Sequence, residues 1–397
     1  MTDFTPTRTA SRLAGLTPFL VMEIMERALD LEARGRSVVH LEIGEPDASP
    51  PRAGLDAAAE ALQLGQTRYT DSCGLLELRQ AIADDYQARC GLRPDPATIL
   101  VTPGTSPAML LAFSLLLDSG GEVIMPEPYY ACYPNFVRYC GGTVVPCVTR
   151  ADESFAVDPE RIRKLVTPQT RAIVLASPSN PTGAVQSLEV MRALAELGPP
   201  LVSDEIYHGL VYGEGEAHSA LGLSDEVFVL DGISKRYSMT GFRLGWLVAP
   251  PWAMPSLRIM QQNFFISAAE PSQRAGLAAL RSGEGTPSAM RREYSARRDQ
   301  LVEGLRELGF GIPHSPQGSF YVLADAQRYG RDSLALAYGL LEEAGVAVAP
   351  GIDFGPSSEG MLRFSYAVSE ASIREALKRM GRVLPEWEKK NEKEAQR

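Results

Sequence analysis

The sequence is poor in metal-binding residues and has no long hydrophobic run. Its five cysteines are odd in number and form no C-x-x-C pair, and its four histidines are scattered, so a zinc site has little support. We expect no metal site, and reduced thiols in a cytoplasmic protein. No apolar run reaches the roughly 18 residues that cross a bilayer, and residues 1–16 lack the apolar segment of a secretory signal.

Positive charge is also scarce. The chain has 39 Lys and Arg residues against 49 Asp and Glu residues, which gives a formal net charge of −10. This balance argues against nucleic acid or an anionic membrane as the main partner. A content of 45% hydrophobic and 22% charged residues is typical of a globular protein, and a length of 397 residues suggests two domains.

The middle of the chain alternates short apolar runs with helical stretches. Runs without a polar face indicate strands of a mostly parallel sheet that helices cover on both faces. These runs begin near residues 98, 122, 143, 172, 201 and 227. A long helical pattern from Ser288 to about Leu308 then leads away from the sheet, towards two further strand patterns, GSFYVLAD and MLRFSYAV.

We therefore predict an α/β fold with two parts. Residues 46–287 would form a large domain, and residues 1–45 with 288–397 would form a smaller α+β domain built from both chain ends. The first 45 residues are assigned to the small domain because they lack the pattern of buried strands. The polar end of the chain, from Glu386, is expected to be solvated and frayed.

One predicted strand-to-helix junction has the features of an anion site. The stretch TPGTSP (102–107) follows the first run, with Ser106 expected to cap a helix and Pro107 to begin it. Free backbone N–H groups of Gly104, Thr105 and Ser106 would then face an anion such as phosphate. A plain turn is the competing interpretation, since the G-K-[ST] of a Walker loop is missing.

Polar residues also follow three of the predicted strands. The stretch SNPTG (179–183) comes after the run that ends at Ala176, Asp204 ends the run at 201, and Lys235 follows the run at 227. Ligands bind at this edge of α/β sheets. Each residue alone has an ordinary explanation, namely a turn, a helix cap or a lysine that reaches solvent. The alternative for Lys235 is a desolvated amine kept reactive towards a carbonyl.

Taken together, these features match the needs of one cofactor. An aldehyde with a phosphate and a pyridine ring requires an amine, an anion for its ring nitrogen, donors for its phenolate and a phosphate cup, and that cofactor is pyridoxal 5'-phosphate. The chain resembles the class I and II aminotransferases of the fold-type-I pyridoxal-phosphate superfamily. The matching segments are GEPD (44–47), RYTDSCGLLELR (68–79), GTS (104–106), PEPYYACYP (126–134), SNPTG, DEIY (204–207), SKRYSMTGFRLGW (234–246) and MLRFSYA (361–367).

The resemblance implies roles around the cofactor. Lys235 would form the Schiff base and later move the proton at the substrate Cα, and Asp204 would pair with the pyridine nitrogen. Asn180 and Tyr207 would hydrogen-bond the phenolate oxygen, and Tyr130 would stack on the ring. The phosphate would be held by the remaining set: Gly104, Thr105, Ser106, Ser234, Arg243 and, from the other subunit of a homodimer, Tyr69.

The resemblance also implies a substrate site. Arg363 lies in a strand-like pattern, where an arginine is hard to bury without a partner. Its planar guanidinium would bind the α-carboxylate of the substrate. Gly44 would bring backbone close to the same carboxylate, and Asn180 and Tyr130 would also contact the substrate.

The predicted reaction is transfer of an amino group from an L-amino acid to a 2-oxo acid, 2-oxoglutarate or pyruvate, by a ping-pong mechanism. A β-elimination lyase would use the same cofactor residues and stays an alternative. A ligand-sensing regulatory protein is a second alternative, but it needs a DNA-binding module for which neither chain end has room or basic charge. One aspartate-using subgroup carries a lysine where this chain has GTS, so we expect neutral or aromatic donors.

Overall fold

The computed structural model describes residues 10–213 and 217–395. Its main sheet has seven strands in the order β2-β8-β7-β6-β5-β3-β4. Strand β8 is antiparallel to both neighbours, and the other pairs are parallel. The strands are β2 (Ile99–Thr102), β3 (Glu122–Glu127), β4 (Thr143–Val148), β5 (Thr170–Ala176), β6 (Leu201–Asp204), β7 (Val227–Gly232) and β8 (Gly245–Val248).

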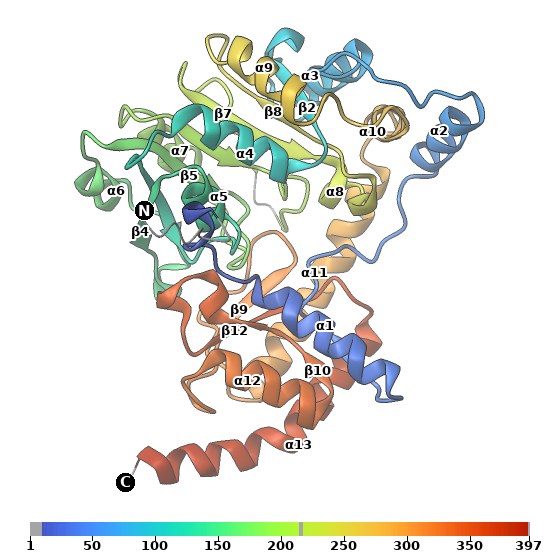
Figure 1. The fold of residues 1–397 in the computed structure, drawn as a ribbon. Helices are drawn as coiled ribbons and strands as arrows, with labels where there is room; N and C mark the ends of the chain where they lie inside the picture. The colour runs from blue at the N-terminus through green and yellow to red at the C-terminus, as the bar shows by residue number, and fades with distance from the viewer. Residues whose placement is uncertain (1–9, 214–216, 396–397) are drawn as a thin grey trace, which may run out of the picture.

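Helices cover both faces of this sheet (Figure 1). Successive strand residues point to opposite faces, so Leu100 packs in one buried apolar cluster while Ile99 and Val101 pack in the other. The helices of the first cluster are α4 (Thr105–Leu116), α5 (Tyr133–Tyr139) and α9 (Met254–Phe264). Those of the second are α3 (Leu76–Cys90), α6 (Pro159–Leu165), α7 (Leu188–Ala195) and α10 (Glu270–Arg281), with α2 (Arg52–Gln63) packed on α10.

The α/β fold with a mostly parallel sheet that helices cover on both faces is thus confirmed.

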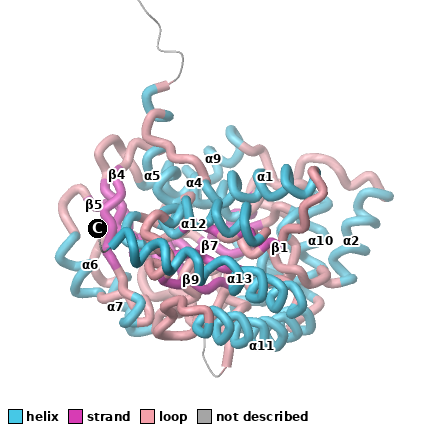
Figure 2. Tube along the Cα trace, turned by 90° about the horizontal axis from the view of Figure 1, so that it is seen from below, coloured by secondary structure: helices cyan, strands magenta, loops and turns pink. Residues whose placement is uncertain are grey.

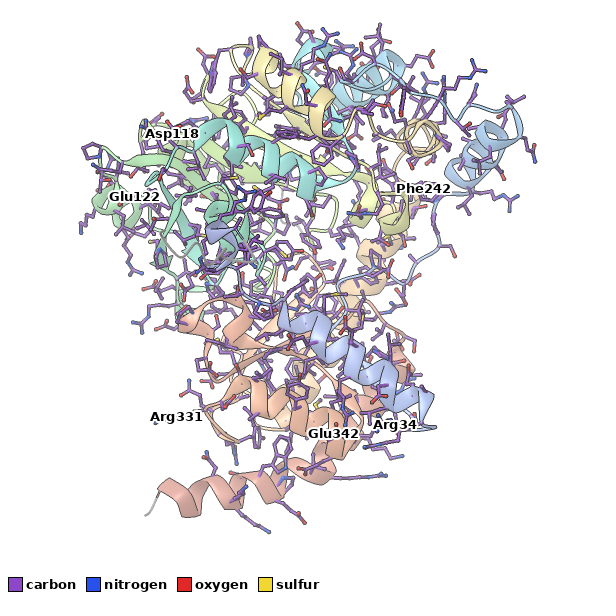
Figure 3. The ribbon with its side chains drawn as sticks, in the orientation of Figure 1. Arg34, Asp118, Glu122, Phe242, Arg331 and Glu342 are labelled. Carbon is purple, nitrogen blue, oxygen red and sulfur yellow. The ribbon has the colours of Figure 1, made fainter. Side chains whose placement is uncertain are left out.

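Two further short helical segments lie next to strands of the large sheet. Helix α8 (Ile233–Arg236) follows β7, and a short 3-10 turn, η4 (Thr240–Phe242), precedes β8; Figure 3 labels Phe242 at the end of this turn. Other short turns are Ser11–Leu13, Pro96–Thr98, Ala151–Glu153, Pro356–Ser358 and η6 (Gly351–Phe354).

Segments from the N-terminal and C-terminal parts of the chain, among them α1 and α13, lie together in a second region (Figure 1). Its three-stranded antiparallel sheet has the order β11-β12-β9, and β1 pairs with β10. Its strands are β1 (Val39–His40), β9 (Tyr321–Asp325), β10 (Val346–Ala347), β11 (Ala349–Pro350) and β12 (Met361–Ser365). Its helices are α1 (Leu20–Ala33), α11 (Gly285–Glu307), α12 (Ser333–Gly339), the π-helical η5 (Leu340–Ala344) and α13 (Glu370–Ala395).

One apolar core joins these distant segments. It contains Ile24 and Leu31 of α1 together with Leu341 of η5 and Met380 of α13. Helices α11 and α13 pack side by side (Figure 2), and Glu342, near the end of α1 that carries Arg34 (Figure 3), forms an ion pair with Arg27. The domain boundaries at residues 45/46 and 287/288 stay a prediction; the second falls in the first turn of α11.

Two local expectations were wrong. Helix α4 begins at Thr105 with Gly104 as its N-cap, so Ser106 is not the cap and Pro107 is not the first helical residue. The end of the chain is helical through Ala395 and not frayed from Glu386, because Trp387 donates to Glu343 (3.0 Å) and anchors this helix. Within the described part of the chain, no helix is long and apolar enough to cross a membrane.

Candidate active site

A cavity of about 390 Å³ lies at the carboxyl ends of β5, β6 and β7. Parallel strands that end at one edge bring side chains from distant segments together there. All the predicted site residues except Gly104 and Tyr69 line this cavity: Gly44, Thr105, Ser106, Tyr130, Asn180, Asp204, Tyr207, Ser234, Lys235, Arg243 and Arg363.

Lys235 projects into the cavity from α8, directly after β7. Its Nζ donates a hydrogen bond to the Gly44 carbonyl. Burial lowers the pKa of Lys235 to about 8; the Glu45 carboxylate opposes this shift, and Arg243 and Arg363 add to it. A lowered pKa leaves a larger fraction of neutral amine near neutral pH, and the neutral amine is the nucleophile.

Asp204 ends β6 on the cavity wall. Its Oδ2 accepts a hydrogen bond from the Tyr133 hydroxyl (2.6 Å), and its Oδ1 accepts one from the Ile206 N–H (3.1 Å). Burial raises the pKa of Asp204, while these two bonds and the Lys235 charge work against the rise. A buried carboxylate of this kind is stabilised by a cationic partner, so the position suits a protonated ring nitrogen.

The N-terminus of α4 forms an anion-binding corner of the site. No side chain caps this helix, so the backbone N–H groups of Thr105 and Ser106 stay available at its positive end. Gly104 has φ 96°, a conformation that favours glycine, and a Cβ there would come within 2.7 Å of the Arg243 guanidinium. Arg243 and Ser234 line the same cavity. This donor set fits a phosphate group.

Three further predicted residues lie between these groups. Asn180 accepts a hydrogen bond from Arg363 on Oδ1 (3.0 Å), which leaves its amide N–H groups for another acceptor. The Tyr207 hydroxyl lies 2.9 Å from the Tyr321 hydroxyl. The Tyr130 ring packs edge-on against Phe19, with 6.0 Å between the ring centroids.

Arg363 is a buried cation that lacks a carboxylate partner among the described residues. Its side chain is 2% exposed on β12, and its guanidinium donates to Asn180 and to the Glu42 carbonyl. Its Nε–H has no acceptor in the described part of the chain. The guanidinium carbon lies 4.3 Å from the Tyr321 ring centroid and 4.9 Å from that of Phe354. A ligand carboxylate would supply the missing counter-charge.

Tyr69 is the predicted residue that the structure places away from this cavity. It is 80% exposed, and its neighbour Thr70 donates from its backbone N–H to the Ser267 hydroxyl (3.4 Å). Its role in the site of a second subunit stays a prediction.

Comparison with known proteins decides the family. The model of "Aminotransferase class I and II" matches residues 36–380. The chain belongs to this aminotransferase family. It is therefore an enzyme that transfers amino groups, in a family that uses pyridoxal phosphate.

Curated aminotransferases resemble the chain over nearly all of its length. An aspartate/prephenate aminotransferase of Thermus thermophilus is 40% identical, covering 94% of this chain and 98% of that protein. A valine–pyruvate aminotransferase of Mycobacterium tuberculosis is 38% identical, with 94% and 97% covered. The solved structure of a T. thermophilus aspartate aminotransferase with maleate matches with a TM-score of 0.90 and 39% identity, over 95% of this chain and 99% of that one.

Several residues of this aminotransferase site were missed in the sequence. Tyr133 lies within the PEPYYACYP segment, three residues after Tyr130, but nothing in the segment alone indicates its bond to Asp204. Tyr321 lies in the strand pattern GSFYVLAD, whose register against β12 cannot be read from the sequence. The apolar wall contributed by α1 was also missed, and it consists of Val21, Met22 and Met25.

Proposed function

We propose that this enzyme binds pyridoxal 5'-phosphate in the cavity and transfers the amino group of an L-amino acid to a 2-oxo acid in a ping-pong reaction. The observation that carries the proposal is the convergence, at one sheet edge, of a lysine with a pKa lowered to about 8, a buried carboxylate and a free helix N-terminus. When bound, the cofactor supplies an electron sink for the electrons of the substrate Cα–H bond.

Side chains of this protein would bind the cofactor and move the proton. The Lys235 amine would hold the aldehyde carbon and, once displaced by substrate, carry the proton at Cα. Asp204 would keep the pyridine nitrogen protonated, while Asn180 and Tyr207 would donate to the phenolate oxygen. Tyr130 would cover the ring face.

The phosphate would lie at the start of α4, where the Thr105 and Ser106 amides meet Ser234 and Arg243. Arg363 would bind the α-carboxylate of the substrate, with Gly44 beside it. Gly104 supports this corner by leaving space for the Arg243 guanidinium.

The relatives favour an aminotransferase over the two alternatives considered from the sequence. No protein named in the comparisons above is a lyase or a regulatory protein, and the family match covers most of the chain. The cytoplasm is the proposed location, which the five free cysteines support because disulfides are rare there.

The lining of the cavity supports a neutral or aromatic amino donor. Its cationic lining residues among those described are Lys235, Arg243 and Arg363, all of which already have proposed partners. The opposite wall is apolar and aromatic, with Phe19, Val21, Met22, Met25 and Ile43. Of the proposed acceptors, pyruvate needs no second cation, whereas 2-oxoglutarate would need one from outside this set. Comparing kcat/KM for phenylalanine, methionine and aspartate tests this; aspartate ahead by more than about a hundredfold would contradict it.

A homodimer with shared sites is the proposed assembly. Tyr69 is exposed and does not line its own chain's cavity, so the proposal assigns it to the site of a second copy. Exposed apolar residues of the same large-domain region, Leu64, Ile259, Phe264 and Ile266, supply surface that a second copy would bury.

The decisive test of the cofactor proposal is Lys235→Ala. Borohydride reduction of the wild-type protein with bound cofactor should fix the cofactor covalently, and the variant should lose both this attachment and nearly all turnover. Ser238→Ala, three residues on, is a control that keeps Lys235. Covalent fixation of cofactor in Lys235→Ala would sink the assignment.

A further inference from the structure

Tyr321 contacts three residues of the site, namely Tyr207, Arg363 and Gly44. No role has been assigned to it so far. It lies on β9, and its ring is almost fully buried. Its hydroxyl lies 2.9 Å from the Tyr207 hydroxyl, and its ring lies under the Arg363 guanidinium, 4.3 Å from centroid to carbon. A Cβ at Gly44 would overlap with its hydroxyl oxygen, so residue 44 covers that hydroxyl closely.

The register of the small sheet produces the contact with Arg363. Arg363 on β12 is paired with Leu323 on β9, so Tyr321, two residues away from Leu323, points to the same face of the sheet. A guanidinium over an aromatic face is attracted to the ring, more strongly where water is excluded. Arg363 lacks a carboxylate partner in the described chain. Its guanidinium instead packs against this ring and against that of Phe354.

The two hydroxyls can bond in either direction. Each tyrosine has one proton to donate, and a buried O–H needs an acceptor. Tyr207 is the hydrogen-bond partner of the Tyr321 hydroxyl among the described residues. Both tyrosines line the cavity, so either proton could point into it. The role proposed below takes the direction in which Tyr321 donates to Tyr207, which leaves the Tyr207 proton free to point into the cavity. The charged and titratable groups that face this pair are Arg363 and Tyr130.

We propose that Tyr321 is a positioning residue with two separable contributions, one through its ring and one through its hydroxyl. The ring holds the Arg363 guanidinium where it meets the substrate carboxylate. The hydroxyl, by donating to Tyr207, directs the Tyr207 proton towards the cofactor phenolate and strengthens that donor. The inference rests on the proposed function.

Two variants of the cofactor-loaded protein separate the contributions. Tyr321→Phe keeps the ring and removes the hydroxyl, whereas Tyr321→Leu removes both. The first readout is the pH midpoint of the visible absorbance change of bound cofactor. The second is the dissociation constant for 3-phenylpropionate, a carboxylate that has no amino group to transfer.

A weaker Tyr207 donor leaves more negative charge on the phenolate oxygen, which holds the proton on the neighbouring Lys235 nitrogen more firmly. In Tyr321→Phe the midpoint should therefore rise by about 0.3 to 1 pH unit, while 3-phenylpropionate binds within about twofold of wild type. In Tyr321→Leu the midpoint should rise similarly, and binding should weaken by about 3- to 30-fold.

A double variant tests whether the hydroxyl acts through Tyr207. Adding Tyr321→Phe to Tyr207→Phe should move the midpoint no further than Tyr207→Phe alone. Tyr329→Phe is the matched control, because Tyr329 donates to the Leu308 carbonyl and does not line the cavity. It should leave both readouts at their wild-type values.

An unchanged midpoint in Tyr321→Phe, or an additive shift in the double variant, would overturn the hydroxyl contribution. Unchanged binding in a folded Tyr321→Leu protein would overturn the ring contribution, and if that variant does not fold, the Tyr321→Phe arm still decides the hydroxyl. Wild-type protein without any visible cofactor absorbance would instead overturn the proposed function, and this inference with it.

Discussion

Asp204 shares its buried position with the Tyr133 hydroxyl, 2.6 Å from Oδ2. This bond favours the charged carboxylate, which burial disfavours. In Tyr133→Phe the pKa of Asp204 should rise further and the carboxylate should become a poorer partner for the ring nitrogen. We expect kcat to fall roughly ten- to a hundredfold, as for a lost hydrogen bond to a charged group. Steady-state kinetics at a fixed pH measures this, and an unchanged kcat would contradict it.

The lowered pKa of Lys235 has a kinetic consequence in cofactor-free protein. Only the neutral amine attacks an aldehyde, so the rate of cofactor uptake should rise about tenfold per pH unit below about pH 8 and level off above it. An ordinary lysine, with a pKa near 10.4, would give a rate that keeps rising to higher pH. Rapid mixing of cofactor with the protein, followed by absorbance, distinguishes the two profiles.

Residue-level prediction from the sequence succeeded where a motif carried the information. Lys235, Asp204 and Asn180 could be located because each follows an apolar run, and the structure brings them to one cavity. Tyr133 and Tyr321 could not, because their partners are fixed by packing between segments 71 and 114 positions apart. Tyr133 lies on α5 and Tyr321 on β9, so these contacts depend on how a helix and a strand pack against segments far along the chain.

Among the elements, α1 is held at its start by a distant carboxylate. Its N-cap residue Phe19 has no capping side chain, and Asp353 of η6 instead accepts hydrogen bonds from the Leu20 and Val21 N–H groups, each at 3.2 Å. This contact fixes the helix that carries Met22 and Met25 into the cavity. The apolar wall for the substrate thus depends on η6.

Removing this contact should loosen the substrate wall. In Asp353→Ala we expect the free energy of unfolding to fall by about 1 kcal/mol, as for other lost N-caps, and KM for apolar donors to rise more than kcat falls. Asp353→Asn is the control, because its amide oxygen can still cap. Urea unfolding and steady-state kinetics are the measurements. Equal damage in both variants would show that the charge, and not the cap, matters.

The starts and ends of helices and strands could also be predicted only in part from the sequence. Six strands of the main sheet were predictable from their apolar runs. At the start of α7 the Ser187 hydroxyl accepts from the Val190 N–H and caps the helix. The start of α4 was predicted two residues too late, because Gly104 and not Ser106 is the N-cap. The helical end of the chain depends on Trp387 and Asn391, which hydrogen-bond to other segments.

At the scale of the whole molecule, the proposed dimer predicts that Tyr69 of one subunit is needed for the activity of the other subunit's site. Mixing Lys235→Ala protein with Tyr69→Ala protein, under conditions that exchange subunits, should give hybrid dimers with one intact site. Random exchange would restore up to about a quarter of wild-type activity, because half the dimers are hybrids and each has one of two sites. Tyr139→Ala, another exposed tyrosine, should not need a partner for activity. No recovery in proven hybrids would contradict the shared site.

The proposed cofactor residues lie around the seven-stranded sheet, whereas Arg363 lies on the small one. Proteins open locally, with some regions unfolding well before others. If the small sheet opens first in mild denaturant, the protein should keep its cofactor, and hence its yellow colour, while it loses the cation that recognises substrate. Colour would then measure how much cofactor a preparation carries, and competent sites would have to be counted by the absorbance change that added amino acid produces.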